Sequence, residues 1–538
     1  MRGRIWLLGA LVSAVGLKAW LLWMDAIPFN ADEAIVALMA RHILQGERPL
    51  FFYGQAYMGS LDAWLVAAGF AILGQHVWVI RLVQTLLYVG VLITTAQLGA
   101  AVFESRPVGI LAAWLMAIPV VNVTLYTTAS LGGYGEALLL GNIILIITLR
   151  IAKKLQRGES VAAWNWLTWG FLVGLGVWAF GLTLVYSVPA GIILAWQLCR
   201  EVRHKVFAPI SMALVGGALG SAPWWGYAIN HGFAHTIGEL GGSAIAGVEG
   251  LPYILQVWQH FTSLFLLGST VTFGLRPPWS IRWLGLPLLP FALAFWLIAL
   301  VQLIKGAASD RQNSGSRLLV GVALTLGLAF VFTPFGADPS GRYFLPLAVP
   351  IAVFAADWVA SLKERLGDHF VSRWNWGLAA LLIVYNLWGT LQSALTYPPG
   401  ITTQFDQTTQ VDQRYLPELM AFLREHGEKS GYTNYWVAYP LAFLSSEELI
   451  FVPRLPYHTD FRYTSRDDRY SAYGELVSKA ERVAYITTRH PSLDQYLQDR
   501  FSELSLTWQE AKIGDFHVFY NISKAVRPEE IGLGVTTP

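Results

Sequence analysis

Three stretches of this sequence carry side chains suited to chemistry, although the chain around them is apolar. Asp32 and Glu33 stand together in "PFNADEAIV", Glu136 follows in "YGEALLLG", and Arg342 and Tyr343 lie in "SGRYFLPLAVP". A carboxylate can take a proton from an attacking nucleophile, and an arginine pairs with phosphate oxygens while keeping its charge. The residue types therefore suit displacement of a phosphate, with Asp32 as the base and Arg342 as the phosphate ligand.

Each of these residues also has an ordinary structural interpretation. Asn30 or Asp32 could cap a helix, where acids favour the positive end of the helix dipole. Glu136 could simply lie just outside a membrane span, and Arg342 could anchor a helix at the lipid headgroups. Spacing along the chain cannot decide between these interpretations, so the elements that position the residues must be considered.

The composition indicates a membrane protein. Of the 538 residues, 54% are hydrophobic and only 13% are charged, and the chain contains 23 Trp. The 37 Lys and Arg nearly balance the 35 Asp and Glu, and the net charge of +2 gives no reason to expect nucleic-acid binding. The single cysteine, Cys199, excludes an intrachain disulfide.

The apolar runs predict about eleven transmembrane helices. The first run, "IWLLGALVSAVGLKAWLLW", follows the basic "MRGR", which keeps that end cytoplasmic; it is long for the core of a signal peptide, and no small-x-small cleavage site follows it. Loops rich in Lys and Arg are expected to be cytoplasmic. Residues 61–73 and 256–274 would break that alternation, so we interpret them as interfacial or re-entrant. The further spans are expected at 78–100, 107–127, 135–150, 166–181, 183–199, 207–229, 284–304, 317–333, 343–362 and 375–394.

This topology places the unusual polar residues on the outer face of the membrane. Residues 1–396 form a polytopic α-helical membrane domain, and charges become frequent after it. The tail, 397–538, contains helical spacing in "RYLPELMAFLREHG" and strand-like runs such as "RVAYITT", which predict a small soluble α/β domain outside the cytoplasm. The outer loops are expected at 24–77, 128–136, 230–283 and 334–342.

The motifs resemble those of the GT-C glycosyltransferases, a superfamily that includes the protein O-mannosyltransferases and the aminoarabinose transferase of lipid A. The shared features are a first span, an outer loop with Asp-Glu-Ala, a helix ending in Gly-x-x-Pro (Gly46 to Pro49) and a second acid about a hundred residues later. "GRYFLPLAVP" is similar to the Arg-Tyr-x-x-Pro segment of their later helices. The motifs cover about the first 150 residues, and the remainder is similar in architecture.

The resemblance implies an inverting hexosyl- or pentosyltransferase. Its donor would be a sugar on polyprenyl phosphate, its acceptor an unidentified lipid, glycan or protein, and its site the outer face of the plasma membrane. Asp32 would be the general base, with Glu33 in support because adjacent helical side chains diverge by about 100°. Glu136 would orient the acceptor or counter the developing charge, and Arg342 with Tyr343 would bind the phosphate.

The stretch "GQAYMG" offers the amide of Gln55 and the phenol of Tyr57 to sugar hydroxyls, although an aromatic belt at the interface is the ordinary alternative. The aminoarabinose transferases have a charged Glu-Lys-Pro-Pro type of sequence at the equivalent place. The resemblance therefore does not imply that this chain uses the same sugar and acceptor as the aminoarabinose transferases.

Two other patterns are weaker indications of function, namely a His and Glu spacing and a charged loop. His231, His235 and Glu239 are spaced to share a helical face and bind a divalent metal, but Gly232 and Gly238 would weaken that helix. No cofactor is assigned, and a divalent metal stays open as an alternative. The loop "SRDDRYSAYGE" (465–475) could touch an acceptor or be a solvated surface loop. A lipid-sugar flippase, an O-antigen-ligase-type transferase and a non-catalytic scaffold remain as alternatives. A transporter would favour repeated halves with polar residues near the membrane midplane.

Overall fold

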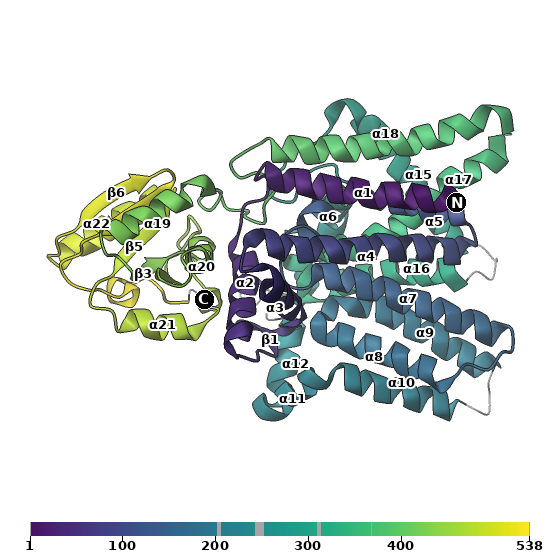
Figure 1. Ribbon diagram of the computed structural model, residues 1–538, viewed down its shortest axis with the longest axis horizontal. Coiled ribbons are helices and arrows are strands. Elements are labelled where there is room, and N and C mark those ends of the chain that lie inside the picture. The colour runs from purple at the N-terminus through teal and green to yellow at the C-terminus, as the bar shows by residue number, and fades with distance from the viewer. Residues whose placement is uncertain (1, 202–205, 243–251, 309–313, 367, 537–538) are drawn as a thin grey trace. The chain divides into compact units, whose positions relative to one another are not determined.

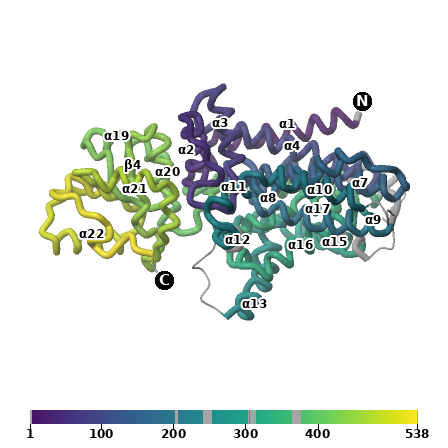
Figure 2. The backbone as a smooth tube through the Cα atoms, turned by 90° about the horizontal axis from the view of Figure 1, so that it is seen from below, coloured from purple at the N-terminus to yellow at the C-terminus, as the bar shows by residue number. Residues whose placement is uncertain are grey.

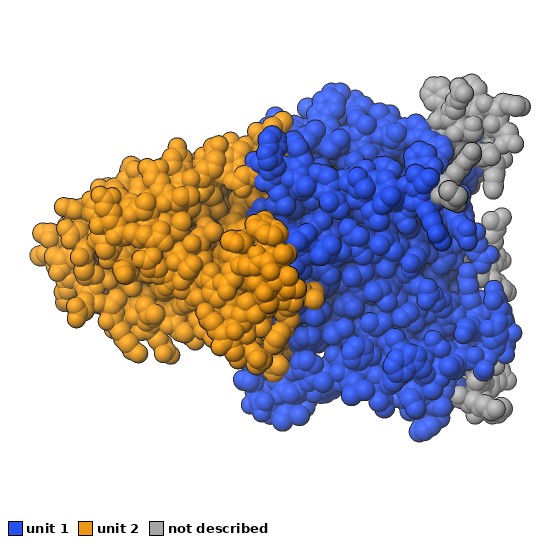
Figure 3. Space-filling view, viewed as in Figure 1, with its two compact units in different colours: residues 1–24, 56–62, 81–393 blue, residues 25–55, 63–80, 394–538 orange. Residues whose placement is uncertain are grey.

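A computed structural model of the chain is largely helical, with one mixed sheet near the C-terminus (Figure 1). It describes residues 2–201, 206–242, 252–308, 314–366 and 368–536. The described residues form two compact units, which are coloured separately in Figure 3. Unit 1 contains residues 1–24, 56–62 and 81–393, and unit 2 contains residues 25–55, 63–80 and 394–538.

Among the described residues, seven helical segments are long and apolar enough to cross a bilayer. This confirms a polytopic α-helical membrane protein. The segments belong to α1 (Arg2–Trp23), α4 (Val77–Phe103), α7 (Tyr134–Gln156), α9 (Leu184–Glu201) with η1 (Gly181–Thr183), α16 (Ser314–Phe332), α17 (Ala348–Leu366) with η6 (Arg342–Leu347), and α18 (Asp368–Ala394).

The other predicted spans differ in length or continuity. The run 107–127 is divided into α5 (Arg106–Ala117) and α6 (Val121–Tyr126), because Pro119 disfavours helical geometry in the residue before it. The run 207–229 is divided into α10 (Phe207–Gly220) and α11 (Ala222–His231), where Pro223 begins the second helix.

Shorter helices complete unit 1. The stretch predicted as interfacial or re-entrant at 256–274 lies in a continuous helical run over residues 253–272, which contains one π-helical turn. These elements are α8 (Ala163–Ala179), α12 (Phe233–Gly242), α13 (Tyr253–Ser263), η3 (Leu264–Gly268, a π-helical turn), α14 (Ser269–Thr272), η4 (Leu286–Leu288), α15 (Leu289–Ala308) and η5 (Pro334–Ala337).

Helices α8 and α10 pack closely along glycines, and they lie alongside each other in both Figure 1 and Figure 2. A Cβ atom on Gly170 would collide with the carbonyl of Ala213, and one on Gly216 would collide with the carbonyl of Leu167. Small residues at such positions let helix backbones approach in lipid, where the hydrophobic effect gives no driving force between helices.

Unit 2 combines two early segments with the C-terminal sheet domain. The early segments carry α2 (Ala31–Gln45), β1 (Phe51–Phe52), the first residue of β2 (Gln55–Gly59) and most of α3 (Leu61–Leu73). The sheet has the order β4-β3-β5-β7-β6, with β3 parallel to β4 and β5, and β7 antiparallel to β5 and β6. Its strands are β3 (Ser430–Thr433), β4 (Ile450–Pro453), β5 (Ala484–Thr488), β6 (Gln509–Ile513) and β7 (Phe516–Tyr520).

Apolar residues of this sheet and of the neighbouring helices form the core of unit 2. Leu419 and Leu423 pack with Phe451, Ile486 and Val518, all nearly inaccessible to solvent. The domain can therefore bury its own core, as its length predicts. The helical elements around the sheet are η7 (Gln413–Tyr415), α19 (Leu416–Glu425), α20 (Tyr435–Leu444), η8 (Ser465–Asp467), α21 (Ser471–Ser478), α22 (Pro491–Glu503) and η9 (Pro528–Ile531).

Candidate functional site

Asp32 lies in the first turn of α2. The side chain of Asn30 caps this helix, because its Oδ1 accepts a hydrogen bond from the backbone N–H of Glu33 at 3.0 Å. Gly46 ends the helix in the left-handed conformation, with φ of 113°. Since Asn30 supplies the cap, the carboxylate of Asp32 is not occupied by that structural role.

The hydroxyl of Tyr435, the first residue of α20, donates a hydrogen bond to Oδ1 of Asp32 at 2.5 Å. Tyr435 is buried, and burial followed by the charge of Asp32 raises its pKa well above the ordinary value for tyrosine. The phenol therefore remains a proton donor and fixes one oxygen of the carboxylate. Asp32 itself is half-buried, whereas Glu33 is fully buried and Gln55 is half-buried.

Further contacts within unit 2 hold α2 against α20. Arg41 donates to the carbonyl of Phe443 at 3.1 Å, and His42 lies 3.0 Å from Oε1 of Glu447. Tyr473 donates to the same oxygen at 2.7 Å. Burial alone would raise the pKa of Glu447, but the His42 and Tyr473 hydrogen bonds and nearby positive charge lower it to about 2. The network restrains the helix that carries Asp32.

Arg342 begins η6 in unit 1. Gly341 precedes it with φ of 71°, a conformation that favours glycine, and a Cβ atom there would meet Val271. The guanidinium donates to Oδ2 of Asp338 at 2.5 Å, and the other oxygen of Asp338 accepts from the backbone N–H of Ser340 at 2.7 Å. Asp338 therefore orients Arg342.

One donor of this arginine is left over. Nε of Arg342 is buried and has no hydrogen-bond acceptor among the described residues. The guanidinium carbon lies 5.1 Å from the centre of the Tyr343 ring, and Tyr57 and Tyr134 are also within electrostatic range. A buried donor without an acceptor is costly, so this arrangement suits an anion supplied by a ligand.

An apolar cavity of about 290 Å³ adjoins this arginine, because Tyr343 and Tyr57 form part of its wall. Residues of η1, α9 and α16 supply most of the remaining wall, among them Leu182, Val188 and Leu326. A hydrocarbon chain would meet an apolar surface here, with a cationic group beside two of the lining tyrosines. The arrangement can therefore hold a lipid that carries an anionic headgroup.

Glu136 lies inside unit 1 and is only 2% exposed. Its neighbour is Asp62, another buried acid, whose oxygens accept hydrogen bonds from Gln84 at 2.8 Å and from Ser130 at 2.5 Å. Both oxygens of Glu136 are buried and have no hydrogen-bond partner among the described residues. Glu136 is therefore remote from solvent and lies beside a second buried acid.

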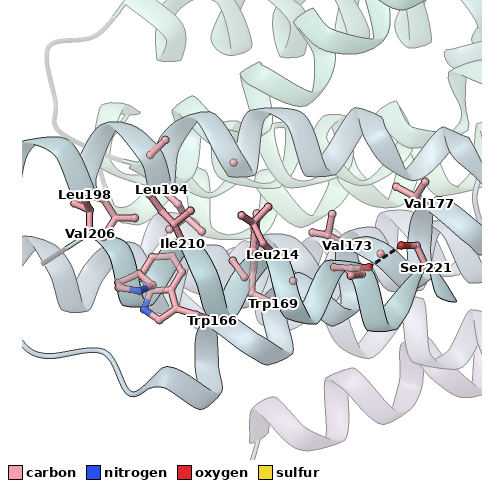
Figure 4. Close-up of a pocket in the computed structure, with 18 of the residues that line it drawn as sticks. Trp166, Trp169, Val173, Val177, Leu194, Leu198, Val206, Ile210, Leu214 and Ser221 are labelled. Carbon is pink, nitrogen blue, oxygen red and sulfur yellow. Dashed lines mark hydrogen bonds between the residues drawn. The ribbon is translucent and has the colours of Figure 1, made fainter. Parts of the chain in front are cut away.

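A larger cavity of about 640 Å³ lies among α8, α9 and α10 (Figure 4). It is lined by apolar side chains such as Trp169, Leu194 and Leu214, and the hydroxyl of Ser221 at its edge accepts a hydrogen bond from Trp225 at 2.9 Å. Among the described residues, none that lines it is charged. The described part of its wall is suited to apolar groups.

The helix that would align His231 with His235 and Glu239 is interrupted. α11 ends at His231, Gly232 has φ of 92°, and α12 begins at Phe233. Within the described ranges, no group of three or more His, Cys, Asp or Glu side chains is placed to hold a metal ion. The shared face that the spacing suggested is therefore not formed.

The structure thus distributes the predicted residues over both units. Arg342, Tyr343, Tyr57 and Glu136 belong to unit 1, with the first three close together, whereas Asp32, Glu33 and Gln55 belong to unit 2. Sequence reasoning missed Asp62, Tyr435 and the orienting role of Asp338. Asp62 was hidden at the start of an apolar run, and no local pattern connects Tyr435 with a residue 403 positions earlier.

No protein-family model matches the sequence, and no curated protein matches it. Solved structures, in contrast, resemble nearly the whole chain. The apo oligosaccharyltransferase of Archaeoglobus fulgidus is similar with a TM-score of 0.56 and 12% identity, over 97% of this chain and 74% of its own. ArnT from Cupriavidus metallidurans bound to undecaprenyl phosphate is similar with a TM-score of 0.51 and 11% identity, over 96% of this chain and 99% of its own. The chain is therefore an integral membrane protein with the fold of the GT-C glycosyltransferases.

Proposed function

We propose that this protein is a glycosyltransferase that moves a sugar from polyprenyl phosphate to an acceptor on the outer face of the plasma membrane. Asp32 is the general base, Arg342 with Tyr343 binds the donor phosphate, and Gln55 and Tyr57 contact the sugar. The sugar is a hexose or a pentose, and the reaction inverts the anomeric centre. The C-terminal domain lies outside the cytoplasm with the active site.

The observation that carries this proposal is the open donor of Arg342 beside an apolar cavity. Its Nε–H has no acceptor among the described residues, while Tyr343 and Tyr57 line a cavity whose other walls are apolar. A polyprenyl phosphate matches both parts, since it joins a charged phosphate to a hydrocarbon chain. The similar ArnT structure holds undecaprenyl phosphate, which supports the same class of ligand here.

The chemistry follows from the assigned groups. Asp32 takes the proton of the acceptor hydroxyl or amine, and the acceptor atom attacks the anomeric carbon. The bond from that carbon to the phosphate oxygen breaks, and its electron pair leaves with the phosphate. Arg342 balances the charge that the departing phosphate gains. Tyr435 already donates to Oδ1 of Asp32, so Oδ2 has more acceptor capacity left and is assigned the proton.

Glu33 and Glu136 are assigned positioning roles. Both are buried, and Glu136 faces Asp62. In this position Glu136 maintains the start of α7, near Tyr134, and thereby the surroundings of Arg342. The two acids are therefore expected to affect the rate through the placement of other groups.

The decisive experiment is Asp32→Asn in the purified, reconstituted protein. Sugar transfer from a polyprenyl-phosphate donor should fall at least about a hundred-fold, because a general base contributes roughly that much or more. Binding of undecaprenyl phosphate should stay unchanged. Asp460→Asn, an exposed acid paired with Arg462, is the matched control.

Two results would contradict the proposal. Sugar transfer near the wild-type rate in Asp32→Asn would show that Asp32 is not the general base. Movement of the lipid-linked sugar across the bilayer without any transfer, equal in both variants, would identify a flippase instead.

A further inference from the structure

The segment 465–469, part of the stretch 465–475 that the sequence left open as a solvated loop or an acceptor contact, is partly buried and contacts α20, the helix whose Tyr435 donates to Asp32. The hydroxyl of Tyr439 in α20 donates to the carbonyl of Asp467 at 2.9 Å and accepts from the backbone N–H of Arg469 at 2.5 Å. The guanidinium of Arg469 lies 5.5 Å from the ring centre of Tyr435. Tyr435 in turn donates to Asp32.

The side chain of Asp467 has no hydrogen bond or ion pair among the described residues. The residue is 7% exposed, and its carboxylate oxygens are not fully enclosed. Its neighbours in electrostatic range are Arg469, His458 and Asp32. Burial raises the pKa of Asp467 to about 7, and the charge of Asp32 adds to this rise while Arg469 and His458 oppose it. A carboxylate in a largely buried residue without a protein donor is available to a ligand that supplies one.

The neighbouring residue behaves differently. Asp468 accepts a hydrogen bond from Arg454 at 3.0 Å and so has a structural partner. Of these two adjacent acids, Asp468 anchors the segment, whereas the carboxylate of Asp467 is available to accept a hydrogen bond from a ligand.

Three aromatic rings form a chain that starts at the partner of Asp32 and ends at Tyr457, which is within electrostatic range of Asp467. Tyr435 and Trp436 pack edge to face with centres 5.2 Å apart, and Trp436 and Tyr457 with centres 6.3 Å apart. Tyr457 interacts electrostatically with Asp467, Arg469 and Asp32. The indole Nε1–H of Trp436 is buried and has no acceptor among the described residues. The cluster thus contains one unused acceptor and one unused donor, together with aromatic rings.

From this arrangement we infer that Asp467, Trp436 and Tyr457, together with Asp32, form the acceptor-binding site, and that the acceptor presents a saccharide to it. Sugar hydroxyls both donate and accept hydrogen bonds, so they can satisfy Asp467 and Trp436 together. The apolar faces of a sugar ring pack on aromatic side chains, and placed polar groups among aromatic rings are typical of small-ligand sites. The inference rests on the proposed function only in making Asp32 the base that faces the acceptor hydroxyl.

The test uses the full-length protein in lipid nanodiscs with methyl α-D-glucopyranoside as the probe, followed by ligand-observed NMR. The wild-type protein should bind the probe. Asp467→Asn and Trp436→Phe should each weaken binding about ten-fold, because each removes one ligand hydrogen bond while preserving side-chain shape or ring. The matched controls are Asp460→Asn and Trp508→Phe, whose parent side chains lie near the surface and have partners of their own.

Three results would overturn the inference: no binding of the probe, binding that both variants leave unchanged, or a Gly-Ser-Gly peptide that binds in place of the sugar and is weakened by the same variants. Thermal unfolding of each variant excludes misfolding as the cause. Binding of undecaprenyl phosphate, measured in parallel, separates the two proposals. If the protein does not bind undecaprenyl phosphate but binds the saccharide through Asp467, the proposed donor is wrong and the saccharide site is supported.

Discussion

Replacing Arg342 by alanine is expected to weaken binding of undecaprenyl phosphate by about ten-fold to a hundred-fold. The structure leaves at least one guanidinium donor, Nε–H, for the phosphate. A hydrogen bond to a charged group contributes about 1.5 to 3 kcal/mol, and each 1.4 kcal/mol is a factor of ten. Arg342→Lys keeps the charge but lacks the planar fork, so it should recover only part of the affinity.

The neighbouring acid complicates the substitution. Asp338 is 7% exposed and would lose its cationic partner in Arg342→Ala, although the backbone N–H of Ser340 would still donate to it. A buried charge left without its partner can destabilise the site and weaken binding indirectly. The double variant Asp338→Asn/Arg342→Gln removes both charges. It therefore tests whether the unpaired charge of Asp338, and not the lost phosphate contact, weakens binding.

Affinity is measured in nanodiscs with labelled undecaprenyl phosphate, alongside the thermal unfolding midpoint. If the phosphate contact is the cause, the double variant will bind as weakly as Arg342→Ala while unfolding near the wild-type midpoint. Exposed Arg106→Ala serves as the control and should bind normally. A dissociation constant for Arg342→Ala within two-fold of wild type would refute the assignment, and so would full recovery in the double variant.

Three other predictions follow from the buried hydrogen bonds. Tyr435→Phe should lower kcat for transfer about ten-fold without changing donor affinity, because Asp32 loses the donor that fixes its orientation; unchanged kcat would show that this bond is incidental. Glu136→Gln should keep activity within about two-fold, since an amide of the same shape can donate to the neighbouring Asp62, whereas Glu136→Leu should lower the unfolding midpoint. The lowered pKa of Glu447 stabilises the folded state above pH about 4.5, and this contribution of about 1 to 2 kcal/mol after solvent screening is lost as the pH falls toward 2. The acid-induced loss of stability should be smaller in Glu447→Gln, as measured by unfolding at pH 7 and pH 3.

The fold class could be predicted from the sequence, because a long apolar run in a bilayer can satisfy its backbone hydrogen bonds only as a helix or within a closed barrel. Seven of the predicted spans are helices of the required length, and the α/β tail forms a sheet domain. Hydropathy averages over a window, so it did not register Pro119 and Pro223, where the helices at 107–127 and 207–229 divide. A closer reading of proline geometry would have placed both breaks.

The candidate site was less predictable, because its contacts connect residues far apart in the chain. The cap at Asn30 follows from local chemistry and is one of the two that the sequence predicted, the other being Asp32. The partners of Asp32 and Glu136 come from residues 403 and 74 positions away, beyond any local pattern. The pairing of Arg342 with Asp338, in contrast, is an i, i+4 contact that the sequence displays.

The bond between Asp32 and Tyr435 has a consequence for biosynthesis. The acid is translated 403 residues before the tyrosine that fixes it. A nascent chain can therefore have inserted its bilayer helices while Asp32 still lacks the hydrogen bond from Tyr435. A message truncated before residue 435 would yield an inserted chain in which the orientation of this carboxylate is not fixed by that bond.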